Sequence, residues 1–200
     1  MTTGVRALVT GSESGFGRAV ASALGDLGVE LVHDDPVALV VHAAVDPVAL
    51  EPRTLAETSA EDWQRSCDEV LRSALECAQD AYRRLHGSGG SLVFVTPTIG
   101  ITGAAHLVAY AAAVEGVRAL AKSAARQWGG ARIRVNCVAP RAELLAPDAR
   151  PLSPDVAEPA LAGVPADVGA VASAITLLAA EGIVVTGATI VVDGGVVMIP

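Results

Sequence analysis

The chain alternates between short apolar runs and longer segments whose apolar residues recur every three or four positions. Apolar runs cover residues 5–9, 30–32, 37–44, 91–96, 133–138 and 189–192. Runs of this length are typical of strands buried in a parallel sheet. The periodic segments predict helices over residues 18–28, 58–86, 105–128 and 167–180.

Local signals set the ends of these helices. Thr58 and Glu61 have the spacing of a capping box, and Asp167 is placed to cap the last helix. Residues 140–166 contain six prolines and are expected to form a loop. Strands and helices alternate along the chain, so residues 1–200 are predicted to form one α/β domain, a doubly wound parallel sheet with helices on both faces.

Composition narrows the class of protein further. With 200 residues, 52% hydrophobic and 18% charged, the chain is suited to one folded domain with a substantial core. No apolar run reaches the ~18–20 residues of a membrane span, and a net charge of −8 without Lys and Arg clusters argues against nucleic acid. Three scattered cysteines are typical of reduced thiols, so a cytoplasmic location is expected.

The remaining metal-ligating residue types favour structural roles. The histidines and cysteines lack the spacing of a metal site, so no metal is expected. His42 ends a predicted buried strand and is interpreted as a hydrogen-bonded core residue. Cys67 and Cys77 lie on one predicted helix, where packing is favoured over redox chemistry.

A glycine-rich turn, TGSESGFG at residues 10–17, lies between the first strand and the first helix. Glycines there allow backbone to approach the pyrophosphate of a dinucleotide, and the helix N-terminus offers free N–H groups. Two interpretations stay open, a bound cofactor and an inherited scaffold without one. The candidate cofactor-binding residues of the turn are Gly11, Ser12, Ser14, Gly15, Phe16 and Gly17.

Several motifs occur in the order found in one enzyme family. They are TGxxxGxG at 10–17, WQR at 63–65, YAAAVEG at 110–116, RIRVNCVAP at 132–140, and VTG at 185–187 followed by VDGG at 192–195. Over nearly the whole chain this pattern resembles the short-chain dehydrogenase/reductase family. The resemblance implies a Rossmann-like sheet, an NAD(P) cofactor and a catalytic set of Asn, Ser, Tyr and Lys, in which Tyr110 matches the Tyr.

The other catalytic positions depart from the family pattern. Val114 stands at the Lys position, Pro97 at the Ser position and Val70 near the Asn position, while Leu145 replaces a cofactor-contacting Thr. A phenol has a pKa of about 10, so without a nearby cation Tyr110 is a poor proton-transfer group at neutral pH. Impaired carbonyl chemistry is therefore expected.

A block of the family fold is missing between the second and third predicted strands. Only His33, Asp34, Asp35 and Pro36 separate them, whereas a parallel crossover normally takes a dozen or more residues. The usual third strand and its flanking helices are therefore expected to be absent. Asp35 falls near where the family binds the adenine ribose, which favours NAD, although a simple turn role before proline is the alternative. With half the adenine pocket missing, NAD binding is expected to be weak or absent.

Three functions are compatible with these observations. The favoured one is a catalytically impaired subunit that assembles with copies of itself or with an active paralogue. The alternative is an active NAD(H)-dependent reductase of a small carbonyl or 3-oxoacyl substrate, with Tyr110 as acid; the third is a small-ligand binding module. In the assembly hypothesis, the alanine-rich helix 105–128 packs on the sheet with one side and meets a second subunit with the other, through a four-helix contact that includes the helix 61–86. Glutamate at Ala113 or Ala124 should then split the oligomer or abolish soluble expression.

Overall fold

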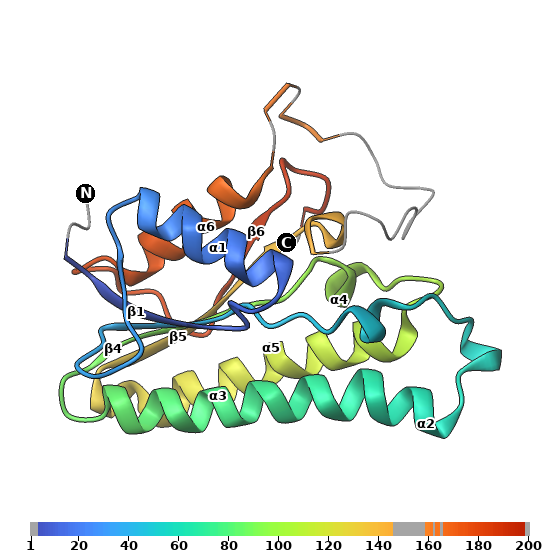
Figure 1. The fold of residues 1–200 in the computed structure, drawn as a ribbon, viewed down its shortest axis with the longest axis horizontal. Helices are drawn as coiled ribbons and strands as arrows, with labels where there is room; N and C mark the ends of the chain where they lie inside the picture. Colours follow the sequence, from blue (N-terminus) through green and yellow to red (C-terminus); the bar gives the residue numbers. More distant parts are fainter. Residues whose placement is uncertain (1–3, 146–158, 162, 165, 199–200) are drawn as a thin grey trace.

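The computed structural model describes residues 4–145, 159–161, 163–164 and 166–198, and it is built on one parallel six-stranded sheet (Figure 1). The strand order is β2-β1-β3-β4-β5-β6. The strands are β1 (Arg6–Thr10), β2 (Glu30–Leu31), β3 (Leu39–His42), β4 (Gly90–Val95), β5 (Ile133–Pro140) and β6 (Thr189–Val192). Most of the predicted 140–166 loop lies outside the described residues.

Helices cover both faces of the sheet, which confirms the doubly wound fold (Figure 1). One face carries α1 (Gly15–Asp26) and α6 (Val168–Ala179), and the other carries α3 (Glu69–Leu85) and α5 (Val108–Trp128). The short helix α2 (Ala60–Trp63) leads through a π-helical turn (Gln64–Asp68) into α3, and α4 (Ile99–Thr102) follows β4. No described helix is long and apolar enough to cross a membrane.

The cap of α2 lies one residue later than the sequence predicted. Ser59, not Thr58, is the N-cap, and its hydroxyl accepts the N–H of Asp62 at 3.1 Å. The Asp62 carboxylate in turn accepts the N–H of Ser59, so the capping box uses Asp62 in place of Glu61. The sequence contains two overlapping Ser/Thr–acid pairs at this spacing, Thr58 with Glu61 and Ser59 with Asp62, so the register of the motif is ambiguous before folding.

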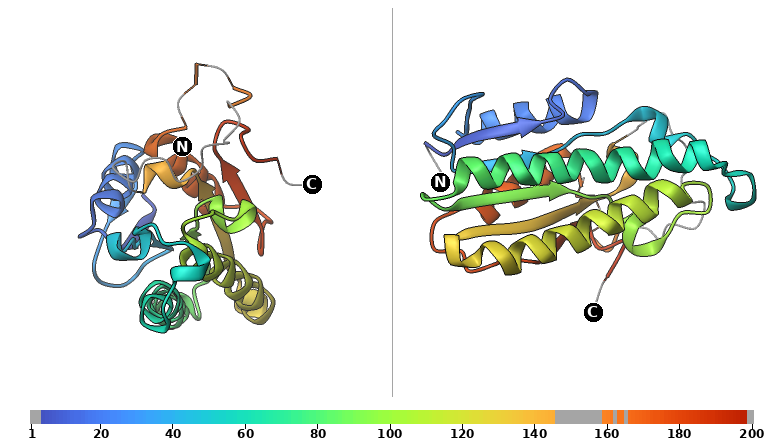
Figure 2. Two further views of the ribbon diagram at one scale, coloured as in Figure 1. Left: turned by 90° about the vertical axis from the view of Figure 1, so that its right-hand side faces the viewer. Right: turned by 90° about the horizontal axis from the view of Figure 1, so that it is seen from below.

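The small residues of α5 are used within the chain. Figure 2 shows α3 and α5 running side by side across one face of the sheet. Ala113 is fully buried with Cys67 of the π-helical turn, and Ala124 is buried in the core between the helices and the sheet. The expectation that Ala113 and Ala124 face a second subunit is therefore wrong, because α3 of the same chain covers that side of α5.

The second strand is short, and the chain returns quickly to the start of β3. Leu31 pairs with Ala7, and the Val32 N–H donates to the Ala7 carbonyl. By Ala38 the chain is back beside Arg6, to whose carbonyl the Ala38 N–H donates. The third strand and its helices are thus absent, as predicted. A short connection is enough because β2 has only two residues, so the chain has only a short distance to travel back before β3 begins.

The last family-like motifs hold the final strand in place. The Asn136 amide of β5 donates to the Val185 carbonyl at 2.9 Å, and its oxygen accepts the Ala188 N–H at 3.1 Å. The buried Asp193 carboxylate accepts the N–H groups of residues 195–197. These residues close the fold at β6 and stand apart from the glycine turn.

Candidate functional site

The glycine turn is held by contacts within the chain. Gly11 has φ +82°, and a Cβ placed there would lie 2.3 Å from the Ala44 Cα. A Cβ on Gly17 would lie 2.0 Å from the Gly11 carbonyl oxygen. The Ser14 hydroxyl caps α1 by accepting the Gly17 N–H at 3.0 Å and donates to the Gly11 carbonyl at 2.8 Å. The turn therefore has the tight geometry that sequence predicted.

This turn forms one wall of a cavity of about 570 Å³. Three segments line it: the turn after β1, the chain after β3, and the first two turns of α3. The lining residues are Gly11, Glu13, Ser14, Gly15, His42, Ala44, Val45, Asp46, Glu69, Val70 and Ser73. The cavity lies at the carboxyl edge of the sheet, where open α/β folds bind their ligands.

The structure separates the predicted cofactor residues into groups. Gly11, Ser14 and Gly15 line the cavity, whereas Phe16, in the first turn of α1, is buried in the core. Gly17 packs against the Gly11 carbonyl, and Ser12 lies on the half-buried part of the turn. Contact of these residues with a cofactor stays a prediction.

Asp35 is not near the cavity, which corrects its expected place beside a ribose. Its carboxylate pairs with Arg84 at 3.1 Å, in the last turn of α3. That helix end packs against the start of β4, at the amino edge of the sheet. The reason is the length of β2, which ends beside Ala7, three residues or about 10 Å before the glycine turn.

His42 forms part of the cavity wall where β3 ends. Its Nδ1 lies 2.8 Å from the Thr10 hydroxyl, and its ring meets Phe94 edge-on, so the predicted hydrogen-bonded core histidine is confirmed. Burial lowers the pKa of His42 to about 4, so the ring is neutral at neutral pH.

Two of the three carboxylates of the cavity, Asp46 and Glu69, were missed in the sequence. Glu13, Asp46 and Glu69 come from three separate segments, and no lysine or arginine is among the described residues that line the cavity. Glu69 could have been found by noting that a helix covering a parallel sheet starts at its carboxyl edge, beside the glycine turn.

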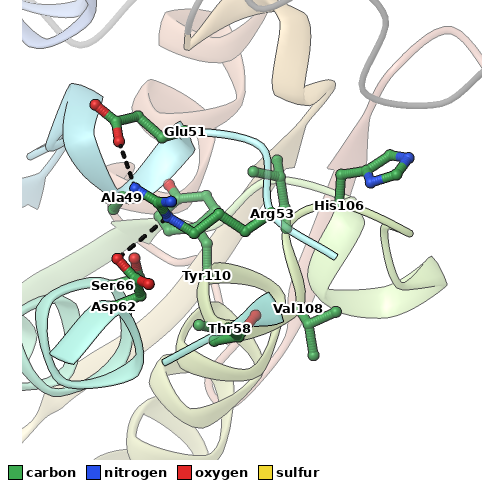
Figure 3. A pocket seen from close by; sticks show the side chains of 11 residues that line it. Ala49, Glu51, Arg53, Thr58, Asp62, Ser66, His106, Val108 and Tyr110 are labelled. Atoms are coloured by element: carbon green, nitrogen blue, oxygen red, sulfur yellow. Dashed lines mark hydrogen bonds and ion pairs between the residues drawn. The ribbon is translucent and has the colours of Figure 1, made fainter. Parts of the chain in front are cut away.

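Tyr110, the predicted catalytic acid, lines a separate cavity of about 10 Å³ (Figure 3). Such a volume is about that needed for one water molecule. Burial, reinforced by the negative charge of Asp46, raises the pKa of Tyr110 above its ordinary value. The family mechanism needs the opposite shift, since a lowered phenol pKa eases proton transfer at neutral pH.

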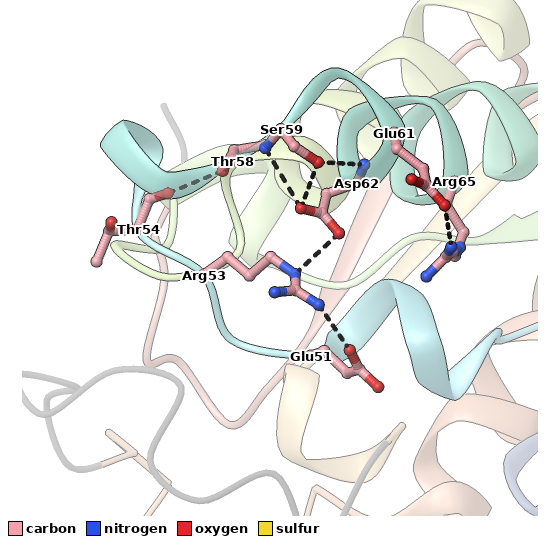
Figure 4. Close-up of polar contacts among 8 residues, drawn as sticks. All are labelled: Glu51, Arg53, Thr54, Thr58, Ser59, Glu61, Asp62 and Arg65. Carbon is pink, nitrogen blue, oxygen red and sulfur yellow. Dashed lines mark hydrogen bonds and ion pairs between the residues drawn. The ribbon is translucent and has the colours of Figure 1, made fainter.

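Arg53 brings a positive charge to the small cavity, but two carboxylates engage it. Its guanidinium pairs with Glu51 and with Asp62, each at 3.1 Å (Figure 4). The Arg53 N–H also donates to the His106 carbonyl at 2.7 Å, which ties this segment to the start of α5. These contacts hold the segment around Arg53 over Tyr110. This structural role accounts for Arg53, so no catalytic role is needed to explain its position.

Three further positions that the resemblance assigns to catalysis or cofactor contact, 97, 114 and 145, hold buried residues, whereas Val70 is half-buried and lines the cavity. Val114 is 3% exposed, and a Cβ on Gly100 of α4 would lie 2.8 Å from its Cγ2. Leu145 belongs to the same buried apolar cluster as Val114 and Tyr110. Pro97 joins β4 to α4, and the Thr98 N–H beside it donates to the Pro140 carbonyl. These contacts stabilise the carboxyl edge but offer neither a charge nor a hydroxyl at the Lys and Ser positions.

Comparison with known proteins assigns the class. The family described as Enoyl-(Acyl carrier protein) reductase matches residues 33–197. A cis-4-hydroxycyclohexanecarboxylate dehydrogenase from Sinomonas cyclohexanicum is 29% identical over 94% of this chain and 95% of its own. An NADPH-dependent aldehyde reductase-like protein of Arabidopsis thaliana is 29% identical over 67% of this chain and 70% of its own.

The fold agrees with that assignment. A solved short-chain type dehydrogenase/reductase from Mycobacterium ulcerans superposes with a TM-score of 0.78 at 23% identity, covering 97% of this chain and 90% of that one. The chain belongs to the short-chain dehydrogenase/reductase family. Its alignment with the Sinomonas enzyme spans 249 positions, more than the 200 residues of this chain, as expected if the block after β2 is missing.

Proteins of this family typically bind NAD(P). The backbone of the glycine turn fits a pyrophosphate, since a helix N-terminus adjoins it. The side chains fit less well, because three carboxylates surround the cavity and Asp35 lies at the other edge of the sheet. The described residues therefore do not match the negative charge of a dinucleotide.

Proposed function

We propose that this chain is a catalytically impaired member of its family that serves as a structural or regulatory subunit. The observation that carries the proposal is Val114, an apolar side chain buried at the position where the family places its catalytic lysine. The raised pKa of Tyr110 and the proline at position 97 support it. Loss of a positioned acid–base partner typically removes ~10²–10⁴ in rate.

Weak or absent NAD binding is the second part of this proposal. The carboxylates of the cavity and the missing block after β2 support an affinity for NADH in the high-micromolar range or worse, less than roughly 6 kcal/mol. We further propose a cytoplasmic location, which suits three cysteines that form no disulfide.

Assembly with copies of itself or with an active paralogue is the third part. The outward side of the α3–α5 layer carries Leu75, which is 46% exposed, together with the exposed Ala112 and Ala119. Small side chains there would let the helices of a second subunit approach closely. Ala119→Glu should therefore lower the mass measured by light scattering without unfolding the chain. A monodisperse monomer of the unmodified protein, with no co-purifying partner, would refute assembly.

Cofactor titration and turnover test the proposal as a whole. Calorimetry with NADH is expected to show high-micromolar or weaker binding, and NADH oxidation with diketone or acetoacetyl substrates is expected to stay at background. Low-micromolar binding with clear turnover would overturn the proposal. It would favour the alternative, an active NAD(H)-dependent reductase, which the printed activities of the relatives suggest.

A further inference from the structure

We propose that residues 51–58 form a strap that closes over Tyr110 and opens when the charge of Arg53 is screened or removed. Tyr110 is 3% exposed, and three residues of this segment, Glu51, Arg53 and Thr58, line the small cavity beside it (Figure 3). The strap controls access to the one residue that matches the catalytic set of the family. This role goes beyond the proposed function and holds whether or not the chain is active.

The strap has no buried apolar side chain to anchor it. Just before it, Ala49 and Leu50 are each 3% exposed, whereas every side chain of residues 51–58 is exposed or half-buried. Leu55, its one large apolar residue, is 67% exposed. Segments with few buried apolar contacts open locally at a lower free energy than the whole fold. Polar contacts must therefore hold the strap closed.

Arg53 supplies those polar contacts. Its backbone N–H donates to the His106 carbonyl at 2.7 Å, within an isolated parallel bridge to Leu107. Its Nε lies 3.1 Å from the Asp62 carboxylate of α2 (Figure 4). Among the described residues, no other residue of the strap makes a hydrogen bond or ion pair beyond residues 51–58. One residue therefore fastens the strap to α2 and to the chain just before α5.

The ion pair of Arg53 with Asp62 is open to solvent. The two side chains are 43% and 20% exposed, so dissolved salt can screen their attraction. The hydrogen bond from the Ser59 hydroxyl and, to a lesser extent, the positive charge of Arg53 lower the pKa of Asp62, which keeps its carboxylate ionised at neutral pH. A partly exposed ion pair stabilises only weakly, and less as salt rises. A change in ionic strength should therefore shift the strap between its closed and open states.

Nitration of the full chain by tetranitromethane, read by peptide mass spectrometry, tests the strap. Tyr110 reports opening, and the half-buried Tyr82, the other tyrosine of the chain, is the reference in the same molecules. The ratio of the Tyr110 rate to the Tyr82 rate should rise about threefold between about 0.01 M and about 1 M NaCl. Arg53→Gln should raise this ratio about fivefold at low salt and remove most of its salt dependence, while Arg53→Lys should restore most of the protection. The matched control is Arg65→Gln, which breaks an exposed ion pair with Glu61 four residues away and should leave the ratio unchanged.

Local opening is distinguished from unfolding by adding urea below the denaturation midpoint. A nitration rate of Tyr110 that is nearly independent of urea supports the strap, because little surface is exposed when it opens. A rate that rises in step with global unfolding, equal ratios for Arg53→Gln and the unmodified chain, or no nitration of Tyr110 in any of these proteins would overturn the inference. NADH oxidation, measured on the same samples, tests the proposed function separately. Turnover with salt-dependent nitration refutes the proposed function alone, and background turnover with salt-independent nitration refutes the strap alone.

Discussion

The glycine turn and the surroundings of Tyr110 lie along the same carboxyl edge of the sheet, yet they have diverged from the family to different degrees. At the turn, the glycines of the family motif are present, and Gly11 and Gly17 make close backbone contacts. Around Tyr110, the tyrosine alone matches the catalytic set that the family resemblance implies, and Val114 and Leu145 pack into the same buried apolar cluster.

The difference shows which residues the fold itself requires. Gly11 and Gly17 are needed by packing, because a side chain at either position would overlap backbone atoms of the same chain. The lysine and serine that the family resemblance implies at positions 114 and 97 would serve chemistry, and here Val114 instead packs in the apolar core. A glycine motif is therefore evidence for a fold before it is evidence for a cofactor.

The largest expected effect comes from Gly17→Ala. Its Cβ would lie 2.0 Å from the Gly11 carbonyl oxygen, so the turn and the start of α1 must shift. We expect a loss of about 4 kcal/mol or more in the free energy of unfolding, measured by urea denaturation.

Gly15→Ala is the matched control two residues earlier in the same helix. No atom lies within 4 Å of the Cβ it would add, so stability should stay within about 0.5 kcal/mol or rise. Equal losses for both variants would contradict a packing role that is specific to Gly17.

Val114→Lys is expected to have the next largest effect. An ammonium placed in the apolar cluster beside Gly100 and Tyr110 should cost about 3 kcal/mol of stability. NADH oxidation should not appear, because Pro97 still offers no donor to a substrate oxygen. Gln127→Lys, at an exposed position in the last turn of the same helix, should leave stability unchanged. A stable Val114→Lys protein that oxidises NADH would show that the apolar cluster is dispensable.

Much of this fold follows from sequence pattern alone. The six strands and the long helices were predicted because apolar runs and helical periods are local signals, as in residues 133–138 for β5 and 167–180 for α6. The missing third strand was predicted because only four residues separate two apolar runs.

The errors in the site arose from interactions that are not local in sequence. Asp35 was misplaced because the length of β2 depends on its register with β1, which the sequence does not display. Ala113 was assigned to a subunit contact because the packing of α3 against α5 cannot be read from the composition of α5. Glu69 was missed because its position beside the glycine turn arises only from the folded topology.

Acid should destabilise the protein through His42. The pKa of this group is about 4 in the folded chain and 6.5 when exposed, so the unfolded state binds its proton first as pH falls. The contribution of neutral His42 to the free energy of unfolding is fully present above pH 6.5 and is lost progressively towards pH 4. The loss is about 2 kcal/mol at pH 5. Urea midpoints measured at pH 7 and pH 5 should show this loss, and His42→Asn should reduce it. An unchanged pH dependence in His42→Asn would assign the effect to other groups.

Tyr110→Phe is expected to have the smallest effect. It tests directly whether the surroundings of Tyr110, unlike the glycine turn, keep only a structural role. Because the phenol is buried among core residues, removing its hydroxyl should cost about 1 kcal/mol, a shift of a few degrees in Tm. The apolar ring still fills its place in the buried cluster that also contains Val114 and Leu107. If Tyr110 is only structural, any slow background oxidation of NADH should be the same in both proteins across the pH range. A drop in that rate with an unchanged Tm would instead make Tyr110 a surviving catalytic acid. The small cavity beside Tyr110 would then be part of an active site.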